Sequence, residues 1–416
     1  MPKLQILSSV LAWCALALAC PVLRAEDAGS PGAADGRAAL RALIDAAKQN
    51  APEVSLARAS LVSSRAALEN GRLAPFGNPY LEVTAERGSK NVTQDVALNG
   101  TLWLPVEVSG QRQSRGREAQ DFVRLHAALV EQARARAAAR LVRAYGSSLV
   151  ATERAAVLSE LLTSARAEAA LIGERVKAGD AIEPDASLAA VEAARHEVML
   201  AETRAQLLRA RGELSEVLGR DAPETTSKVA PPSLSSGDFR AIKLDRTPQA
   251  RALSAEAHFY SSAAERWRRE GQSPLGLMLV AGRGDLGETR LGAGLAYALP
   301  AFRTNRPESA RALAESTRAM TERRVQQSLA GKRLQLIALE QEQLSRAIAT
   351  LTTSALPAAQ QAVSAVQETY AAGKAELLAV LLSRRELSAL SLRRLELLEQ
   401  NWLLVSEYVE ITGQLP

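Results

Sequence analysis

Histidine, cysteine and closely spaced carboxylates are the side chains that most often carry catalysis or bind metal ions, and this sequence keeps them apart. The three histidines, His126, His196 and His258, each stand alone in a stretch with helical periodicity. Glu197 follows His196, but no second histidine lies at the spacing of a zinc protease motif. No glycine-rich loop follows a strand and opens a helix, as a nucleotide site requires. We therefore predict a protein that is not an enzyme and that has no cofactor and no metal site.

Acidic residues gather instead at two interruptions of long helical stretches. The first interruption reads ERVKAGDAIEPD (Glu174–Asp185), and the second reads ETYAAGKAE (Glu368–Glu376). Carboxylates that faced a pore at these places would favour cations. The same carboxylates at the first turn of a returning helix would stabilise its N-terminus instead. Both interpretations stay open for four residues: Asp180, Glu183, Asp185 and Glu376.

Both cysteines, Cys14 and Cys20, fall in an N-terminal targeting sequence. A short positive start and the apolar run 4–19 precede the sequence VLRAED, so we expect a signal peptide over residues 1–25 and export of the chain. The sequence LALAC also resembles a lipoprotein processing site, with Cys20 as the acylated residue. Lipidation of Cys20 and cleavage after Ala25 both stay open.

The composition favours long helices over a large globular core. Hydrophobic residues make up 47% of the chain but aromatic residues only 4%, so the apolar side chains are mostly alanine, leucine and valine. The 51 basic and 46 acidic residues are interspersed, as on a solvated helix surface with ion pairs three or four residues apart. We expect no nucleic-acid partner, because no basic patch stands out.

Five landmarks recur in the same order at offsets of 194 to 196 residues, which indicates an internal duplication. We place the first structural repeat at 26–219, a linker at 220–245 and the second repeat at 246–416. Each repeat is expected to contain a first helix, a β-hairpin and a long helical hairpin. The paired landmarks are Pro52 and Pro248, Pro79 and Pro274, Leu104-Pro105 and Leu299-Pro300, Gly179 and Gly373, and Gly219 and Gly413.

Two pairs of short segments alternate apolar with polar or small residues at the period of a β-strand, which predicts hairpins over 79–105 and 274–300. Isolated hairpins are marginal in water, whereas strands of this length with one apolar face are typical of transmembrane β-barrels. Four strands cannot close a barrel, so closure would need several copies of the chain. Two hairpins packed on a helix bundle are the alternative. The residues expected to face lipid are Leu81, Val83, Leu102, Leu277, Leu279 and Leu295.

Each hairpin is followed by a helical stretch of unusual length, which ends near Gly179 or Gly373 and is followed by a returning helix. About seventy residues of helix span roughly 100 Å, longer than a globular domain. The returning helices carry two apolar stripes, which indicates a neighbour on each side, as in the wall of a helical cylinder. The expected helices run over about 36–71, 108–177 and 184–218 in the first repeat, and over about 247–270, 306–372 and 375–412 in the second.

With these elements in place, the chain resembles the TolC family of outer-membrane efflux channels over essentially all of the sequence after the signal peptide. The resemblance rests on NAPEVSLARASLVSSRAAL in the first helix and on YALPAFRTNRPESARALAES at the second strand-to-helix junction. That junction is similar to the heavy-metal and cation efflux branch, although AFRTN departs from the usual PLPLFNRN. The segments RVKAGDAIEPD and TYAAGKAELLAVLLSRRELSALSL resemble the helical tips of the family.

The resemblance implies a mainly α fold with a small β part. Long coiled-coil helical hairpins would form an α-barrel, and four strands per chain would enter a trimeric, twelve-stranded transmembrane β-barrel. It also implies a homotrimeric exit duct of a tripartite efflux system, in the outer membrane with a periplasmic extension, which passively conducts substrate and, in this branch, metal cations. Expected partners are outer-membrane lipid, a periplasmic adaptor protein and an inner-membrane RND-type pump. A soluble periplasmic coiled-coil adaptor or scaffold is the alternative.

By the same resemblance, the helical tips would dock the adaptor and gate the channel. The sequence leaves open the exported substrate, the cognate pump and the tip residues that line the pore. The tip residues concerned are Arg175, Gly179, Asp180, Asp185, Tyr370, Gly373 and Glu376.

Overall fold

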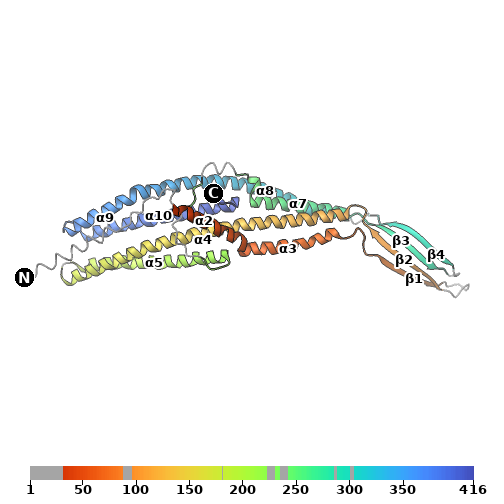
Figure 1. Ribbon diagram of the computed structural model, residues 1–416, viewed down its shortest axis with the longest axis horizontal. Coiled ribbons are helices and arrows are strands. Elements are labelled where there is room, and N and C mark those ends of the chain that lie inside the picture. Colours follow the sequence, from red (N-terminus) through yellow and green to blue (C-terminus); the bar gives the residue numbers. More distant parts are fainter. Residues whose placement is uncertain are drawn as a thin grey trace, which may run out of the picture.

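The protein is an elongated bundle of helices with a small sheet at one end (Figure 1). This computed structural model describes residues 31–87, 96–179, 181–222, 230–234, 242–284, 288–299 and 304–416. The helices are α2 (Pro31–Asn50), α3 (Pro52–Arg72), α4 (Gln111–Lys177), α5 (Glu183–Leu218), η1 (Leu244–Arg246), α7 (Pro248–Glu270), α8 (Arg306–Thr350), η2 (Leu351–Ala355), α9 (Leu356–Ala371) and α10 (Leu377–Thr412). The strands are β1 (Tyr80–Arg87), β2 (Val96–Val106), β3 (Leu275–Arg283) and β4 (Thr289–Tyr297).

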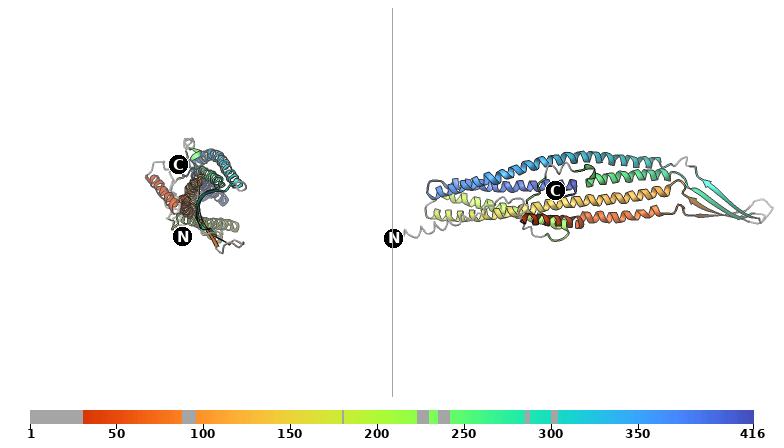
Figure 2. Two further views of the ribbon diagram at one scale, coloured as in Figure 1. Left: turned by 90° about the vertical axis from the view of Figure 1, so that its right-hand side faces the viewer. Right: turned by 45° about the horizontal axis from the view of Figure 1, so that its top comes forward.

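Helix α4 is the axis of the molecule, with 67 residues that span about 100 Å. It packs against α3 and α7 in the half nearer the sheet and against α5 and α10 in the other half. Helix α7 in turn packs on α8, and α10 packs on α8 and α9. The chain is therefore a curved layer of helices, ordered α3, α4, α7, α8 in one half and α5, α4, α10, α9 in the other (Figure 2).

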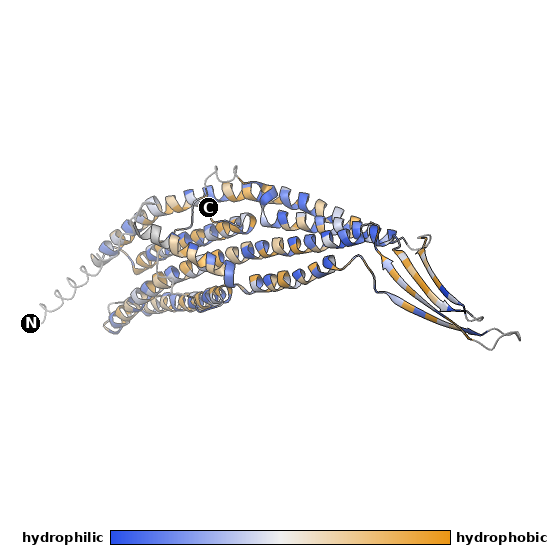
Figure 3. Cartoon of the chain, turned by 45° about the vertical axis from the view of Figure 1, so that its right-hand side comes forward, coloured by the Kyte–Doolittle hydropathy of each residue, from blue (hydrophilic) through white to orange (hydrophobic). Residues whose placement is uncertain are grey.

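The four strands form one antiparallel meander in the order β1-β2-β3-β4. Leu81 lies opposite Leu102, and Leu102 lies opposite Leu279. Directly opposed residues point to the same side of a sheet, so the alternation in the single strands adds up to one apolar face across all four. Figure 3 shows this alternation of apolar and polar residues along the strands.

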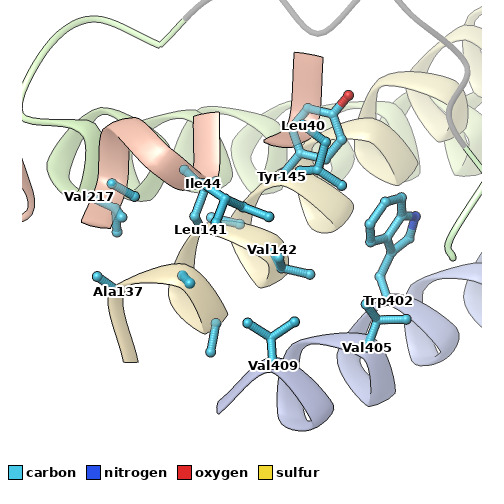
Figure 4. Packing of buried hydrophobic residues seen from close by; sticks show 14 of the residues in the cluster. Leu40, Ile44, Ala137, Leu141, Val142, Tyr145, Val217, Trp402, Val405 and Val409 are labelled. Atoms are coloured by element: carbon cyan, nitrogen blue, oxygen red, sulfur yellow. The ribbon is translucent and has the colours of Figure 1, made fainter. Parts of the chain in front are cut away.

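The main apolar core lies where α2, α4, α5 and α10 meet (Figure 4). Trp402 of α10 is buried there and lies edge-on to Tyr145 of α4, with ring centroids 5.8 Å apart. Gly146 makes room for the indole, since a Cβ at this position would lie 2.4 Å from Trp402 Cγ. Fully buried alanines, Ala137 and Ala138, let α4 approach its other neighbours closely. The core is thus built on close helix contacts around one large aromatic side chain.

The first helix of the chain differs from the prediction. The periodicity predicts one helix over about 36–71, but the structure has α2 and α3, separated by Ala51 with a φ of −56° and a ψ of 140°. Pro52 is the physical reason, because the residue before a proline disfavours the helical conformation while proline itself suits the first turn of a helix. Ala51 is fully buried, so the break lies within the packed core.

The second rod is also interrupted where a single helix is predicted over about 306–372. A π-helical turn, Leu351–Ala355, separates α8 from α9. Leu356 donates its N–H to the carbonyl of Leu351, five residues earlier, and Pro357 has no N–H to donate. Threonine hydroxyls that bond to the carbonyl four residues back tend to bend helices. Three do so here: Thr350, Thr352 and Thr353.

The other predicted helices and all four strands are present, with ends that differ from the prediction by a few residues. Helix α4 begins at Gln111 rather than 108, because Gly110 adopts a left-handed conformation with a φ of 82°. Among the residues that the structure describes, no helix has an apolar stretch long enough to cross a membrane.

We expect Gly146→Ala to lower the thermal unfolding midpoint, because the new Cβ must displace Trp402 in a packed core. Overpacking of this kind costs about 1–3 kcal/mol, against the roughly 1 kcal/mol that alanine gains over glycine in a helix. Gly173→Ala in the same helix is the matched control, since no atom lies within 4 Å of a Cβ there. It should leave the midpoint unchanged or raise it. Circular dichroism melts measure both, and equal shifts would contradict the close contact at Gly146.

Candidate functional site: the helical tips and the apolar face of the sheet

Both helical hairpins turn at the end of the molecule opposite the sheet (Figure 1). Gly179 and Gly373 adopt left-handed conformations there, with φ values of 79° and 70°. Each glycine donates its N–H to a carbonyl three residues earlier, of Val176 and Tyr370 respectively. A side chain would be strained at either position, so the two glycines fix where the rods end.

The acidic residues near the tips take different positions. Helix α5 begins at Glu183, after Ile182 with a φ of −97° and a ψ of 151°. Pro184 is therefore the second residue of α5, whereas the sequence predicted a helix that begins at 184. Glu183 is exposed and Asp185 half-buried, both in the first turn of α5, and Glu376 is exposed directly before α10. Asp180 lies outside the described residues.

Arg175 and Tyr370 join the two tips directly. The Arg175 guanidinium donates to the Tyr370 hydroxyl at 2.8 Å and lies 5.8 Å from the ring centroid. Beneath this contact, Ile172 of α4, Ala189 of α5 and Leu377 of α10 form a small buried apolar cluster. The sequence indicated Arg175 and Tyr370 separately, since each precedes a tip glycine by three or four residues, but it did not indicate their contact or the cluster below it.

Ion pairs link α4 to α10 behind the tips, and the sequence analysis missed them. Arg384 of α10 pairs with Glu168 of α4. With the Gln367 amide of α9 assigned so that its oxygen faces this guanidinium, Arg384 donates to that oxygen at 2.7 and 3.0 Å. Burial raises the pKa of the Glu168 carboxyl above its ordinary value, and the charge of Arg384 partly offsets this. One arginine therefore ties three helices of both hairpins together.

At the other end of the molecule, the six residues predicted to face lipid all lie on one face of the sheet. The strand register aligns them, and none points to the opposite side. They are also exposed, from 39% for Leu277 to 70% for Leu295. Further exposed apolar residues share this face: Val96, Leu98, Leu291 and Tyr297.

The opposite face of the sheet, called the polar face below, carries charged and amide side chains of the strands together with some larger apolar or aromatic residues. Tyr80 and Trp103 stack there at the end nearer the helices, with ring centroids 5.7 Å apart, and Met278 and Val280 lie in β3. The polar residues of this face include Glu82 and Glu86 of β1, Asn99 and Thr101 of β2, and Arg290 of β4. Arg290 pairs with Glu288 at the loop end of β4. The two faces of this small sheet thus differ in chemistry as the two sides of a barrel wall do.

The two lateral edges of the helical layer carry exposed apolar side chains. Of the two stripes predicted on α5, one packs on α4 and the other is exposed, with Val191 and Val198 on the side away from α4. On α8, exposed residues lie on the side away from the buried Leu334 and Ile337. They are Val325, Leu329, Leu336 and Leu339.

The histidines do not come together. Burial lowers the pKa of His126 and of His196 below the ordinary value, which favours the neutral ring. His126 lies edge-on to Phe122, with ring centroids 4.6 Å apart. Within the described ranges, no group of three or more histidine, cysteine, aspartate or glutamate residues could hold a metal ion.

The order of helix, strand pair and long helical hairpin, repeated once and with a small sheet at one end, is also found in solved structures of TolC-type outer-membrane channels. The solved structure of VceC from Vibrio cholerae matches 91% of this chain and 97% of its own, with a TM-score of 0.72 and 18% identity. The solved structure of CusC matches 90% of this chain and 92% of its own, with a TM-score of 0.67 and 14% identity.

In sequence, the chain is similar to the cobalt-zinc-cadmium resistance protein CzcC of Cupriavidus metallidurans. The two are 27% identical over 390 residues, which is 92% of each chain. No family model matches the chain. The fold class predicted from the sequence is confirmed, and so is the resemblance: the chain has the fold of TolC-type channels and is similar in sequence to a protein of the CzcC/CusC type.

We expect Arg175→Ala to separate the two tips of a chain, because it removes both the hydrogen bond to Tyr370 and the cation–π contact. Spin labels on Lys177→Cys and Lys374→Cys, both exposed, report the distance between the tips. Dilution with unlabelled chain confines the signal to one protomer. With Arg175 present, the label-to-label distances should form a single narrow distribution. With Arg175→Ala, the mean distance should be longer and the distribution broader.

Tyr370→Phe should give an intermediate result, since it removes the hydrogen-bond acceptor and keeps the ring. Arg166→Ala is the matched control, because Arg166 of α4 pairs at 2.9 Å with Glu197 of α5 within a single hairpin. A distribution that does not change with Arg175→Ala would show that this contact does not hold the tips together.

Proposed function

We propose that this chain forms a homotrimeric exit duct in the outer membrane, which conducts substrate passively from a periplasmic adaptor and an inner-membrane pump. The observation that carries the proposal is the sheet, with one apolar and one polar face and two lateral edges that pair with no other described strand. Exposed backbone groups at such edges have no water to bond with in lipid, so the edges need partners. Pairing β4 of one copy with β1 of the next supplies them.

The dimensions of the sheet support this proposal. Strand β3, with nine residues, spans about 27 Å, which a tilt of about 40° reduces to a height of about 21 Å. A lipid-facing band of roughly 25 Å is usual for outer-membrane barrels. Phe76 and Tyr297, exposed aromatics on the apolar face, lie at its end nearer the helices, where barrels place an aromatic girdle. Three copies of four strands would make twelve.

The helices support the same assembly. The edge that begins with β1 continues as α3 and α5, and the edge that begins with β4 continues as α8 and α9. Both edges expose apolar side chains, among them Val191 and Val198 on one side and Val325 and Leu329 on the other. A head-to-tail contact between these edges would bury both and close a ring. A soluble adaptor or scaffold, the alternative from the sequence, leaves the apolar face of the sheet without a role.

We propose that the two halves of the chain, 26–219 and 246–416, are repeats of one ancestral unit joined by the linker 220–245. The order of helix, strand pair and helical hairpin in both halves supports this. The signal peptide over 1–25 and the lipidation of Cys20 stay predictions, since both lie outside the described residues.

We propose that the tips dock the adaptor and gate the duct. Their contact through Arg175 and Tyr370 supports this, because it can hold the two hairpins of one protomer together or release them. The exposed Glu376 directly precedes Leu377, which belongs to the apolar cluster that Tyr370 packs against, so a partner protein could reach Glu376 at the tip. The chain supplies conduction and the pump supplies energy, so the proposed role requires no catalytic group in this chain.

We propose metal cations as the substrate. The similarity to a protein named for cobalt, zinc and cadmium resistance supports this. So does the charge of the polar sheet face, where Arg290 is paired while ion pairs are found for neither Glu82 nor Glu86 among the described residues. Three copies would place two rings of carboxylates inside the duct, and such rings favour cations.

The membrane assignment is tested with Leu279→Lys and its neighbour Val280→Lys, which lie mid-strand on opposite faces of β3. Leu279→Lys should abolish detergent-extractable trimer in the outer-membrane fraction, because a lysine facing lipid at mid-depth costs about 2–4 kcal/mol per chain. Val280→Lys would face the water-filled interior and should assemble. Equal assembly of the two variants, or release of the unchanged protein by osmotic shock, would refute the proposed function.

The charge assignment is tested in planar bilayers. Glu82→Gln combined with Glu86→Gln should shift the reversal potential in a KCl gradient toward lower cation preference, since both carboxylate rings are lost. Glu288→Gln combined with Arg290→Gln is the control, because it removes a neutral pair at the loop end of the sheet, where Glu86 also lies. An unchanged reversal potential in the first variant would contradict a pore-facing position of the two glutamates.

A further inference from the structure

Two arginines lie on the otherwise apolar face of the sheet, at its end away from the helices. Arg87 is the last residue of β1 and lies opposite Val96, and Arg283 is the last residue of β3 and lies opposite Leu98. Opposed residues share a face, so both guanidinium groups extend from the same face as the predicted lipid-facing leucines. The apolar face thus ends in aromatic rings near the helices and in positive charge near the loops.

Neither arginine has a carboxylate partner among the described residues, and both are exposed. No aspartate or glutamate of the four strands lies on this face, since Glu82 and Glu86 point to the polar side. Arg290 provides the contrast. It is at the same end of the sheet, but it lies on the polar face and pairs with Glu288.

The position and the charge of Arg87 and Arg283 together indicate what kind of ligand they would bind. An arginine at the rim of a lipid-facing surface is positioned at the depth of the lipid headgroups. Its planar guanidinium binds phosphate through two parallel hydrogen bonds. Two strand spacings and two residues along the strand put the Cα atoms of Arg87 and Arg283 about 12 Å apart. This separation suits two phosphates at the ends of a disaccharide better than one phosphate bound by both arginines.

We propose that Arg87 and Arg283 form a binding site for a diphosphorylated glycolipid of the outer leaflet, with acyl chains along the leucines of β1–β3 and one phosphate at each arginine. The site rests on the proposed function, because it needs the sheet to lie in the outer membrane with its loops outward. Three copies carry six such arginines around the barrel. The lipid fixes the height of the barrel in the membrane.

The test uses the full chain, purified in detergent and stripped of lipid, with diphosphoryl lipid A as the probe and its phosphate-free form for comparison. Native mass spectrometry measures the apparent affinity. Arg87→Gln combined with Arg283→Gln should bind the diphosphoryl form about thirtyfold more weakly than the unchanged chain, because each basic residue near an anionic surface contributes about a factor of five. Arg290→Gln should bind as the unchanged chain does. The phosphate-free form should bind all variants equally weakly.

Equal affinity of the double variant and the unchanged chain for diphosphoryl lipid A would overturn the site, as would equal binding of the phosphate-free form by the unchanged chain. If the double glutamine variant does not assemble, Arg87→Lys combined with Arg283→Lys is used in its place, because it retains the positive charge. Its affinity for diphosphoryl lipid A should lie between that of the unchanged chain and the thirtyfold weaker affinity expected of the glutamine variant. Binding by this lysine variant as tight as by the unchanged chain would overturn bidentate recognition. The same preparations are also tested for trimer formation and for recovery in the outer-membrane fraction. If the unchanged chain fails these two tests, the proposed duct is refuted; if it passes them but does not prefer diphosphoryl lipid A, only the glycolipid site is refuted.

Discussion

The backbone along the outer edges of β1 and β4 is the constraint on which the rest of this molecule depends. Four strands with one apolar face cannot satisfy both edges within one chain, and in lipid no water replaces the missing partner. The helices lie side by side in the same order as the strands, because α3 is connected to β1 at one edge and β4 is connected to α8 at the other. This organisation is what the proposed closed wall requires of each of its segments, and the chain exposes apolar side chains along both edges from the sheet to the helices.

Away from the sheet, the fold is held by contacts between immediate neighbours in the helical layer rather than by one large core. Fully buried alanines bring α4 close to its neighbours, and Trp402 fills the space that Gly146 leaves. Toward the tips, half-buried ion pairs between α4 and α10 take over, at Arg394 with Glu153 and at Arg384 with Glu168. Such pairs cost desolvation and contribute specificity, since a helix shifted by one turn would leave a charge without its partner.

The sequence predicted the strands, the two glycine turns and the long rods because each depends on a local signal: period-two alternation, a glycine that adopts positive φ, or sustained helical periodicity. It failed where two local signals compete. The apolar periodicity runs through Ala51 and Leu351. Pro52 breaks the helix at Ala51, whereas at Leu351 the chain stays helical and forms a π-helical turn ahead of Pro357, which has no N–H to donate. The sequence also did not predict contacts between segments that are distant in the chain. The hydrogen bond between Arg175 and Tyr370, for example, joins residues 195 positions apart. The side-by-side placement of Arg87 and Arg283 on one face likewise depends on the pairing of strands from the two halves of the chain.

The π-helical turn at Leu351–Ala355 gives the two long helices of one chain unequal stiffness. Helix α4 continues to its tip without interruption. Helix α9, with 16 residues, is instead connected to α8 through the π-helical turn, whose hydrogen bonds span five residues rather than four. A force applied at the mouth would bend the second hairpin at this turn before it bent the first. In the proposed trimer, the mouth would therefore alternate compliant and rigid elements, and any widening of the aperture would begin at the compliant ones.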